Sequence, residues 1–206
     1  MPEDESPAEV PAEEEPQEPA TEVKQERLEA DNGFRGEANE RELQELVANL
    51  STNILIIGAG GAGNNTLERL YREGIDGVEM LALNTDAQHL LAARVPHRML
   101  IGKQLTKGLG AGAEPRLGEG AAEEARDDLL NACHGADIVF LTGGLGGGTG
   151  TGALPVMARF AKEKEALTIA IVTLPFSNEG ARRAKNAKQG LERLRKVADT
   201  VIVIPN

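Results

Sequence analysis

Short apolar runs alternate with longer segments of helical periodicity from residue 53 to the end of the 206-residue chain. Most of the runs are rich in β-branched residues, and runs that are apolar throughout are typical of a parallel sheet with both faces covered by helices. The chain is therefore predicted to be an α/β protein with a doubly wound, mostly parallel sheet. The predicted strands are Ile54 to Ile57, Val78 to Leu83, Arg98 to Ile101, Asp137 to Leu141, Thr168 to Thr173 and Thr200 to Ile204.

The segments between these runs carry apolar residues at helical spacing, which predicts helices on both faces of the sheet. In such sheets, ligands bind outside the carboxyl ends of the strands, so chemistry is expected in the loops that follow the strands. The predicted helices lie near Asn65 to Glu73, Asp86 to Ala92, Leu117 to His134, Ala153 to Lys164 and Asn178 to Val197.

The first 50 residues differ sharply from the rest in charge. They hold 16 Asp or Glu against 4 Lys or Arg, which leaves 17 of the 33 acids and 18 of the 22 bases to the other 156 residues. So acidic a segment, with few large apolar residues, cannot offset its ordering entropy. We expect residues 1–38 to be an acidic disordered tail. Residues 39–51 are predicted to form an amphipathic helix because Leu43, Leu46, Val47 and Leu50 recur at helical spacing, and residues 52–206 form the domain.

Composition also argues against several partners. No contiguous basic stretch is present to bind nucleic acid, and the acidic tail would repel DNA and anionic membrane surfaces. Residues 138–157 lack charge but include seven glycines and Pro155, so we interpret them as strand, loop and helix, with no direct membrane insertion.

The lone Cys133 is expected to be buried and fits a reducing compartment, the cytoplasm. The three histidines lack metal-ligand spacing, so no metal site is predicted.

Two glycine-rich loops carry the chemistry. Gly58 to Asn65 follows the first strand, and its glycines and the next helix N-terminus favour an anion, in a dinucleotide or a mononucleotide site. Gly146 to Gly152 follows the fourth strand and feeds a helix expected to carry Pro155 in its first turn. This second phosphate cradle favours one triphosphate held by two loops, with the hydroxyls of Thr149 and Thr151 as further donors. No Gly-x-x-x-x-Gly-Lys-Ser/Thr motif occurs, which argues against the P-loop class.

Four loops, in order, resemble those of the tubulin/FtsZ family of GTPases. They are Asn84 to Gln88, Gly108 to Ala113, Gly146 to Gly152 and Pro175 to Gly180, and the resemblance covers Asn53 to Asn206. It implies a tubulin-like, Rossmann-related domain that binds GTP or GDP, with Mg²⁺ accompanying the nucleotide.

The resemblance also implies roles for individual residues. The α- and β-phosphates would lie on Gly61, Ala62, Gly63, Asn64 and Asn65, the β- and γ-phosphates on Gly148, Thr149 and Gly150, and the γ-phosphate would be sensed by Ala111, Gly112 and Ala113. Glu179 would bind the ribose with Arg183 as its companion base, although by themselves the two residues would be read as an ordinary helix ion pair. Asn206 matches a residue that contacts the guanine base in this family, and its amide could both donate and accept hydrogen bonds at a purine edge.

Members of this family continue beyond the position of Asn206 into a central helix and a second domain. That second domain supplies the acid that activates water on the neighbouring subunit's nucleotide. We therefore expect a C-terminally incomplete domain with no catalytic residue of its own, which binds GTP without hydrolysing it alone. The implied partners are copies of itself, stacked head to tail at the division site, and division-ring membrane adaptors. The alternatives are a nucleotide-binding scaffold without turnover and a nicotinamide-dependent oxidoreductase.

Overall fold

The computed structural model describes residues 40–43 and 52–206, which belong to two separate units of the chain. Residues 40–43 are helical with exposed side chains, and they fall within the predicted amphipathic helix. The predicted acidic tail and the remainder of that helix lie outside the described residues. The fold therefore concerns residues 52–206.

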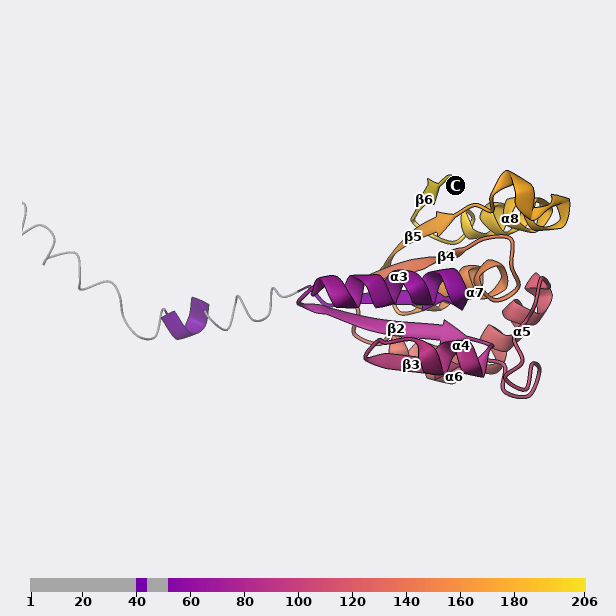
Figure 1. Ribbon diagram of the computed structural model, residues 1–206. Helices are drawn as coiled ribbons and strands as arrows, with labels where there is room; N and C mark the ends of the chain where they lie inside the picture. Colours follow the sequence, from indigo (N-terminus) through magenta and orange to yellow (C-terminus); the bar gives the residue numbers. More distant parts are fainter. Residues whose placement is uncertain (1–39, 44–51) are drawn as a thin grey trace, which may run out of the picture. The chain divides into compact units, whose positions relative to one another are not determined.

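Six strands form one sheet in which every neighbouring pair is parallel (Figure 1). The strand order is β3-β2-β1-β4-β5-β6, the doubly wound arrangement, which confirms the predicted fold class. The strands are β1 (Ile54–Ala59), β2 (Val78–Asn84), β3 (His97–Leu100), β4 (Ile138–Gly144), β5 (Leu167–Thr173) and β6 (Thr200–Ile204).

The helices differ from the prediction mainly at their boundaries. The single helix expected between Leu117 and His134 is two helices, because the backbone leaves helical geometry at Ala125 (φ −96°, ψ 20°). Pro155 lies inside its helix and not in the first turn, since that helix already begins within the glycine-rich loop. The described helices are α3 (Gly60–Glu73), α4 (Ala87–Ala92), α5 (Pro115–Glu124), α6 (Arg126–Ala132), α7 (Thr149–Glu163), the short 3₁₀ helix η2 (Ser177–Glu179) and α8 (Ala181–Leu194).

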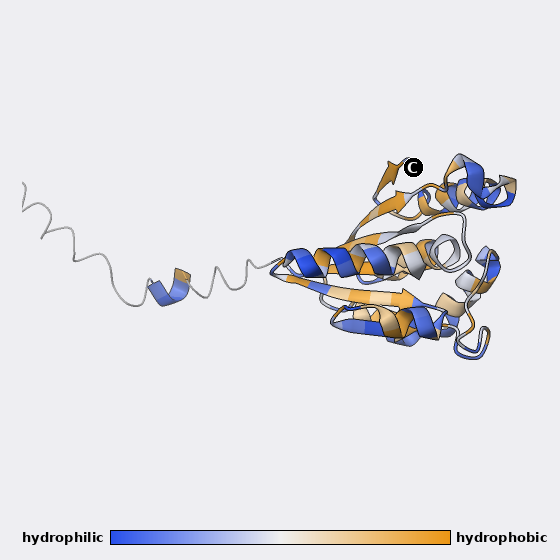
Figure 2. Ribbon diagram, viewed as in Figure 1, coloured by the Kyte–Doolittle hydropathy of each residue, from blue (hydrophilic) through white to orange (hydrophobic). Residues whose placement is uncertain are grey.

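Two apolar cores, one on each face of the sheet, show that helices cover both sides. Ile57 of β1 belongs to the larger core with Phe160 of α7, while its neighbour Ile56 packs with Leu67 of α3 in the smaller one. Successive strand residues point to opposite faces, so a strand buried on both sides must be apolar throughout. Figure 2 shows these apolar strands against helices that are largely hydrophilic outside. Among the helices described, none is long and apolar enough to cross a membrane.

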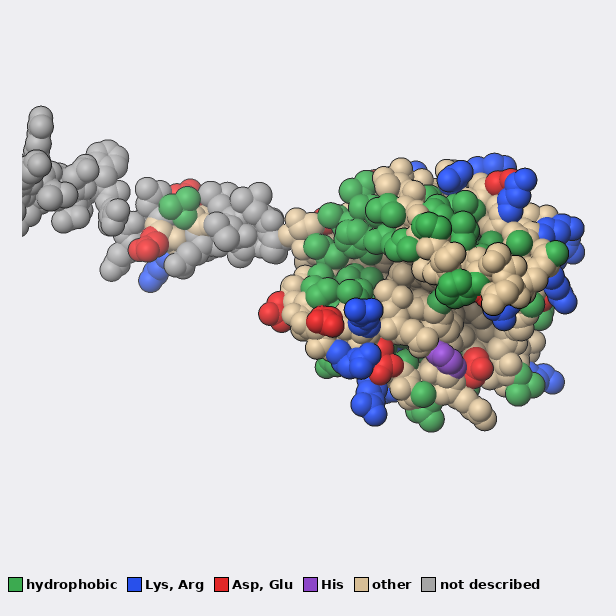
Figure 3. All heavy atoms as spheres, turned by 45° about the horizontal axis from the view of Figure 1, so that its top comes forward, with side chains coloured by type: hydrophobic (Ala, Val, Ile, Leu, Met, Phe, Trp, Pro, Cys, Tyr) green, Lys and Arg blue, Asp and Glu red, His purple; other side chains and the backbone are tan. Residues whose placement is uncertain are grey.

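Apolar side chains remain exposed on β6 and the adjoining part of β5. Ile202 and Ile204 are 48% and 44% exposed, and Ile202 is aligned with Ile171 in the sheet. Figure 3, in which this edge of the sheet is turned toward the viewer, shows apolar side chains gathered over it. A contiguous apolar surface of this kind is typical of a contact surface.

Candidate functional site

The candidate site is a cavity of about 350 Å³ at the carboxyl ends of β1, β4 and β5. Strands β1 and β4 are neighbours at the point where the strand order reverses, and in doubly wound sheets this is where a ligand crevice opens. Eight of the eleven predicted site residues line the cavity, namely Gly61, Ala62, Gly148, Thr149, Gly150, Glu179, Arg183 and Asn206. The prediction that the two glycine-rich loops form walls of one site agrees with this geometry.

Two long helices, α3 and α7, begin at this cavity. Neither has a side chain that caps its N-terminus, and neither has an acidic residue in its first turn. The first N–H groups of a helix lack partners inside it, and the helix dipole adds partial positive charge at the same end. Two uncapped N-termini beside one cavity form an anion-binding arrangement suited to phosphate groups.

Glycine is required where the two helix starts meet. Gly60 has φ +72°, and a Cβ atom there would lie 3.1 Å from the backbone nitrogen of Gly150. A Cβ atom on Gly150 would lie 2.7 Å from the carbonyl oxygen of Gly144. Side chains at these positions would push the two loops apart and open the cavity floor.

Three predicted phosphate residues lie on α3 but do not line the cavity. Gly63 packs against β4, and a Cβ atom there would lie 2.5 Å from the carbonyl oxygen of Thr142. Asn64 is fully buried, and its amide nitrogen is assigned toward the carbonyls of Gly58 and Leu83 because the reverse orientation would face oxygen against oxygen. Asn65 is exposed. Nucleotide contacts by Gly63, Asn64 and Asn65 remain predictions.

The threonine hydroxyls of the second loop are engaged inside the protein. The Thr149 hydroxyl lies 2.7 Å from that of Thr85, and the Thr151 hydroxyl accepts a 2.8 Å hydrogen bond from the backbone N–H of Gly146. Thr151 is only 1% exposed and does not line the cavity. The expectation that its hydroxyl would serve as a ligand donor was therefore wrong, because the hydroxyl shapes the loop instead.

Glu179 and Arg183 form an ion pair, and both residues line the cavity. The backbone N–H of Phe176 donates to the Glu179 carboxylate at 2.8 Å. This hydrogen bond and the Arg183 guanidinium lower the pKa of Glu179 below its ordinary value, so the carboxylate is ionised at neutral pH. A carboxylate has more acceptor sites than these two contacts use, which leaves capacity for ribose hydroxyls.

Asn206 lies at the cavity near the end of β5. Its amide nitrogen donates to the carbonyl oxygen of Leu174 at 2.7 Å, so the amide is held by the segment that follows β5. Gly112 lines the cavity as well, while Ala111 is buried behind it. The loop predicted to sense the γ-phosphate therefore reaches the cavity through Gly112.

Asn186 of α8 was not foreseen as part of the site. Its side-chain nitrogen donates to the carbonyl oxygens of Ala113 and Gly146, which belong to two different loops of the site. An asparagine inside a helical pattern carries no distinguishing sequence signal. Within residues 40–43 and 52–206, no group of three or more His, Cys, Asp or Glu could hold a metal ion.

Comparisons with known proteins agree with this geometry. The GTPase domain of the Tubulin/FtsZ family matches residues 53–206. Cell division protein FtsZ 1 of Archaeoglobus fulgidus is 57% identical over 183 residues, covering 89% of this chain and 49% of the relative.

Solved structures give the same relationship. An empty FtsZ dimer from M. jannaschii has a TM-score of 0.77 and 51% identity, covering 81% of this chain and 49% of that one. The GDP-bound CetZ1 monomer from Haloferax volcanii has a TM-score of 0.69 and 31% identity, covering 75% of this chain and 51% of that one. The chain spans about half the length of the curated relatives it matches. With a family domain aligned over three quarters of its length, and with both phosphate loops at one cavity, the chain belongs to the Tubulin/FtsZ family.

Proposed function

We propose that the cavity binds GTP or GDP, with the phosphates at the N-termini of α3 and α7. The observation that carries this proposal is the meeting of two uncapped helix N-termini at one cavity. A single helix start is a general anion site, whereas two starts flanked by glycines fit a chain of several phosphates. The GDP-bound state of the H. volcanii neighbour supports the same ligand class.

The other end of the cavity fits a nucleoside. The ionised Glu179 carboxylate offers acceptors for ribose hydroxyls, and Arg183 holds that carboxylate in place. The Asn206 amide is positioned by Leu174 and supplies a donor and an acceptor to a purine edge. Mg²⁺ would bind with the nucleotide, because phosphates supply the oxygen ligands that this cation prefers.

The proposal extends to the longer protein to which this chain corresponds. That protein polymerises head to tail in the cytoplasm at the division site, where membrane adaptors attach the filament. The neighbouring subunit's second half completes GTP hydrolysis, so the 206-residue chain binds nucleotide without turnover. The names of the relatives, cell division proteins, and the dimer of the M. jannaschii neighbour support this assignment.

Isothermal titration calorimetry on the chain tests the nucleotide. GTP and GDP are expected to bind, and ATP and NADH more weakly or not at all. Stronger binding of NADH than of GDP would overturn the proposal in favour of a dinucleotide enzyme. Release of phosphate from GTP by the isolated chain would contradict its assignment as a half-site.

A pair of neighbouring arginines on α8 provides a matched control. Arg183→Ala removes a group that lines the cavity and is expected to weaken GDP binding roughly tenfold. Arg182→Ala removes the same charge from a side chain that is 72% exposed and forms a long 3.8 Å ion pair with Glu114. Equal losses in the two variants would show a general charge effect and no contact in the cavity.

A further inference from the structure

One amide group ties together two loops of the proposed site. The side-chain nitrogen of Asn186 lies 3.0 Å from the carbonyl oxygen of Ala113 and 3.3 Å from that of Gly146. An amide nitrogen carries two hydrogens, so it can donate to both carbonyls at once. Asn186 is half-buried and lies one turn beyond Arg183 on α8, so the helix that supplies the ribose pair also holds these two loops.

The two loops are also joined directly. The backbone N–H of Gly148 donates to the carbonyl oxygen of Gly112 at 2.8 Å. A Cβ atom on Gly118 of α5 would lie 2.4 Å from the carbonyl oxygen of Gly148, so α5 and the start of α7 touch backbone to backbone. Close packing of this kind transmits a shift in one loop to the other.

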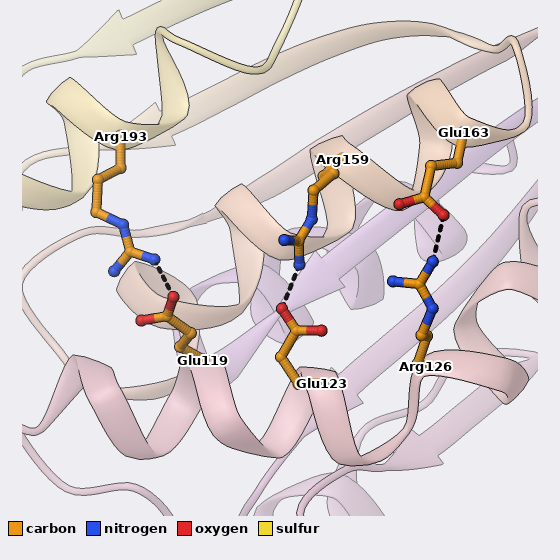
Figure 4. A network of polar contacts seen from close by, with 6 residues as sticks. All are labelled: Glu119, Glu123, Arg126, Arg159, Glu163 and Arg193. Atoms are coloured by element: carbon orange, nitrogen blue, oxygen red, sulfur yellow. Dashed lines mark hydrogen bonds and ion pairs between the residues drawn. The ribbon is translucent and has the colours of Figure 1, made fainter.

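Further from the cavity, three ion pairs connect the same helices (Figure 4). They join α5 to α8, α5 to α7 and α6 to α7, and all six side chains are partly exposed. Exposed pairs contribute little individually. The links nearest the cavity are therefore the hydrogen bond from Gly148 to Gly112, the close contact of Gly118 with Gly148 and the Asn186 amide. The pairs are Glu119 with Arg193, Glu123 with Arg159 and Arg126 with Glu163.

We infer that Asn186 is a positioning residue that holds the loop of residues 111–113 against the second glycine-rich loop and so favours the triphosphate over the diphosphate. This inference rests on the proposed function. Gly112 lines the cavity next to Gly148, where the terminal phosphate is proposed to lie, so a shifted loop weakens contacts that GTP makes and GDP lacks. The α-phosphate and the nucleoside are proposed to lie against the loop after β1 and Glu179, to which Asn186 donates no hydrogen bond.

The experiment compares the affinities of the chain for GTPγS and GDP. Asn186→Ala removes both hydrogen bonds, and Asn186→Asp turns carboxylate oxygens toward the two carbonyls. Each variant is expected to raise the Kd for GTPγS roughly tenfold while the Kd for GDP changes less than about threefold. Gln189→Ala, which removes an exposed amide one turn further along α8, is expected to change neither Kd.

The ratio of the two Kd values separates positioning from simple destabilisation. A purely structural role for Asn186 would lower Tm and weaken both nucleotides equally, which would overturn the inference. An unchanged Kd for GTPγS in Asn186→Ala would also overturn it, while the proposed function would stand. If the wild-type chain bound neither nucleotide, the proposed function itself would fail.

Discussion

Gly152 shows how much one residue limits the packing beneath the site. A Cβ atom there would lie 2.0 Å from the carbonyl oxygen of Pro115. Both atoms are fixed to the backbone, so neither could move aside unless the backbone itself shifted. We predict that Gly152→Ala lowers the free energy of unfolding by about 1–3 kcal/mol, because α5 and α7 must separate. Gly147→Ala serves as the control, since nothing lies within 4 Å of its Cβ position. Urea denaturation measures both, and similar losses would contradict the proposed close packing.

Cys133 is fully buried in the larger core, as the sequence led us to expect. Burial raises the pKa of its thiol from an ordinary 9.0 to about 11. Folding therefore favours the protonated thiol over the thiolate. The contribution of this group to the free energy of unfolding is fully present below pH 9 and is lost as the pH rises toward 11. We predict slow reaction with a thiol reagent at pH 8 in the native chain and fast reaction in urea. Rapid native labelling would contradict the burial.

At the scale of single residues, the sequence itself pointed to the two glycine-rich loops, whereas Glu179, Arg183 and Asn206 were named through the family resemblance. All three residues line the cavity. Asn186 acts through contacts with segments distant in the sequence, and no local pattern reports such contacts. The Thr151 hydroxyl was expected to reach the ligand because residue spacing alone does not show that the packing of α7 buries this side chain.

At the scale of elements, apolar packing outweighs the ion pairs between helices. Phe160 of α7 is fully buried, with the guanidinium groups of Arg126 and Arg159 at 4.9 and 5.4 Å from its ring centre. We predict that Phe160→Ala costs about 3–5 kcal/mol of unfolding free energy, whereas Glu123→Gln costs less than about 1 kcal/mol. The smaller loss is expected to vanish at 1 M salt, because exposed pairs are screened. A salt-independent loss for Glu123→Gln would assign that side chain a packing role.

The strands could be predicted more accurately than the helix starts for a physical reason. A strand buried on both faces has to be apolar throughout, so β1 and β5 are visible as runs. The start of α7 lies within a glycine-rich segment, where helix propensity is poor, and tertiary contacts such as that of Gly152 with α5 hold it helical. Likewise, the break at Ala125 has neither glycine nor proline to mark it.

At the scale of the whole domain, strand order is what converts two separate loops into one site. The loops after β1 and β4 lie about 85 residues apart in the sequence, yet β1 and β4 are neighbours in the sheet. Parallel neighbours end on the same edge, so both helix N-termini face one cavity. From the sequence alone, the only reason to join the two loops in one site was that a second phosphate cradle had to be explained. The pairing of β1 with β4 shows how the two loops come together.

Because the proposed nucleotide contacts loops from β1, β4 and β5, its binding must stabilise the domain as a unit. GDP at 100 times its Kd is expected to add about 2.7 kcal/mol to the free energy of unfolding, which corresponds to a Tm increase of roughly 5–10 °C. Differential scanning fluorimetry with GDP and with ATP at equal concentration measures this shift, and Arg183→Ala is expected to reduce it at a fixed GDP concentration. An equal shift with ATP would show that the phosphates alone carry binding and that Asn206 does not read the base. No shift with GDP at millimolar concentration would contradict a site spanning three strands, since any ligand that binds only the folded chain must raise its stability.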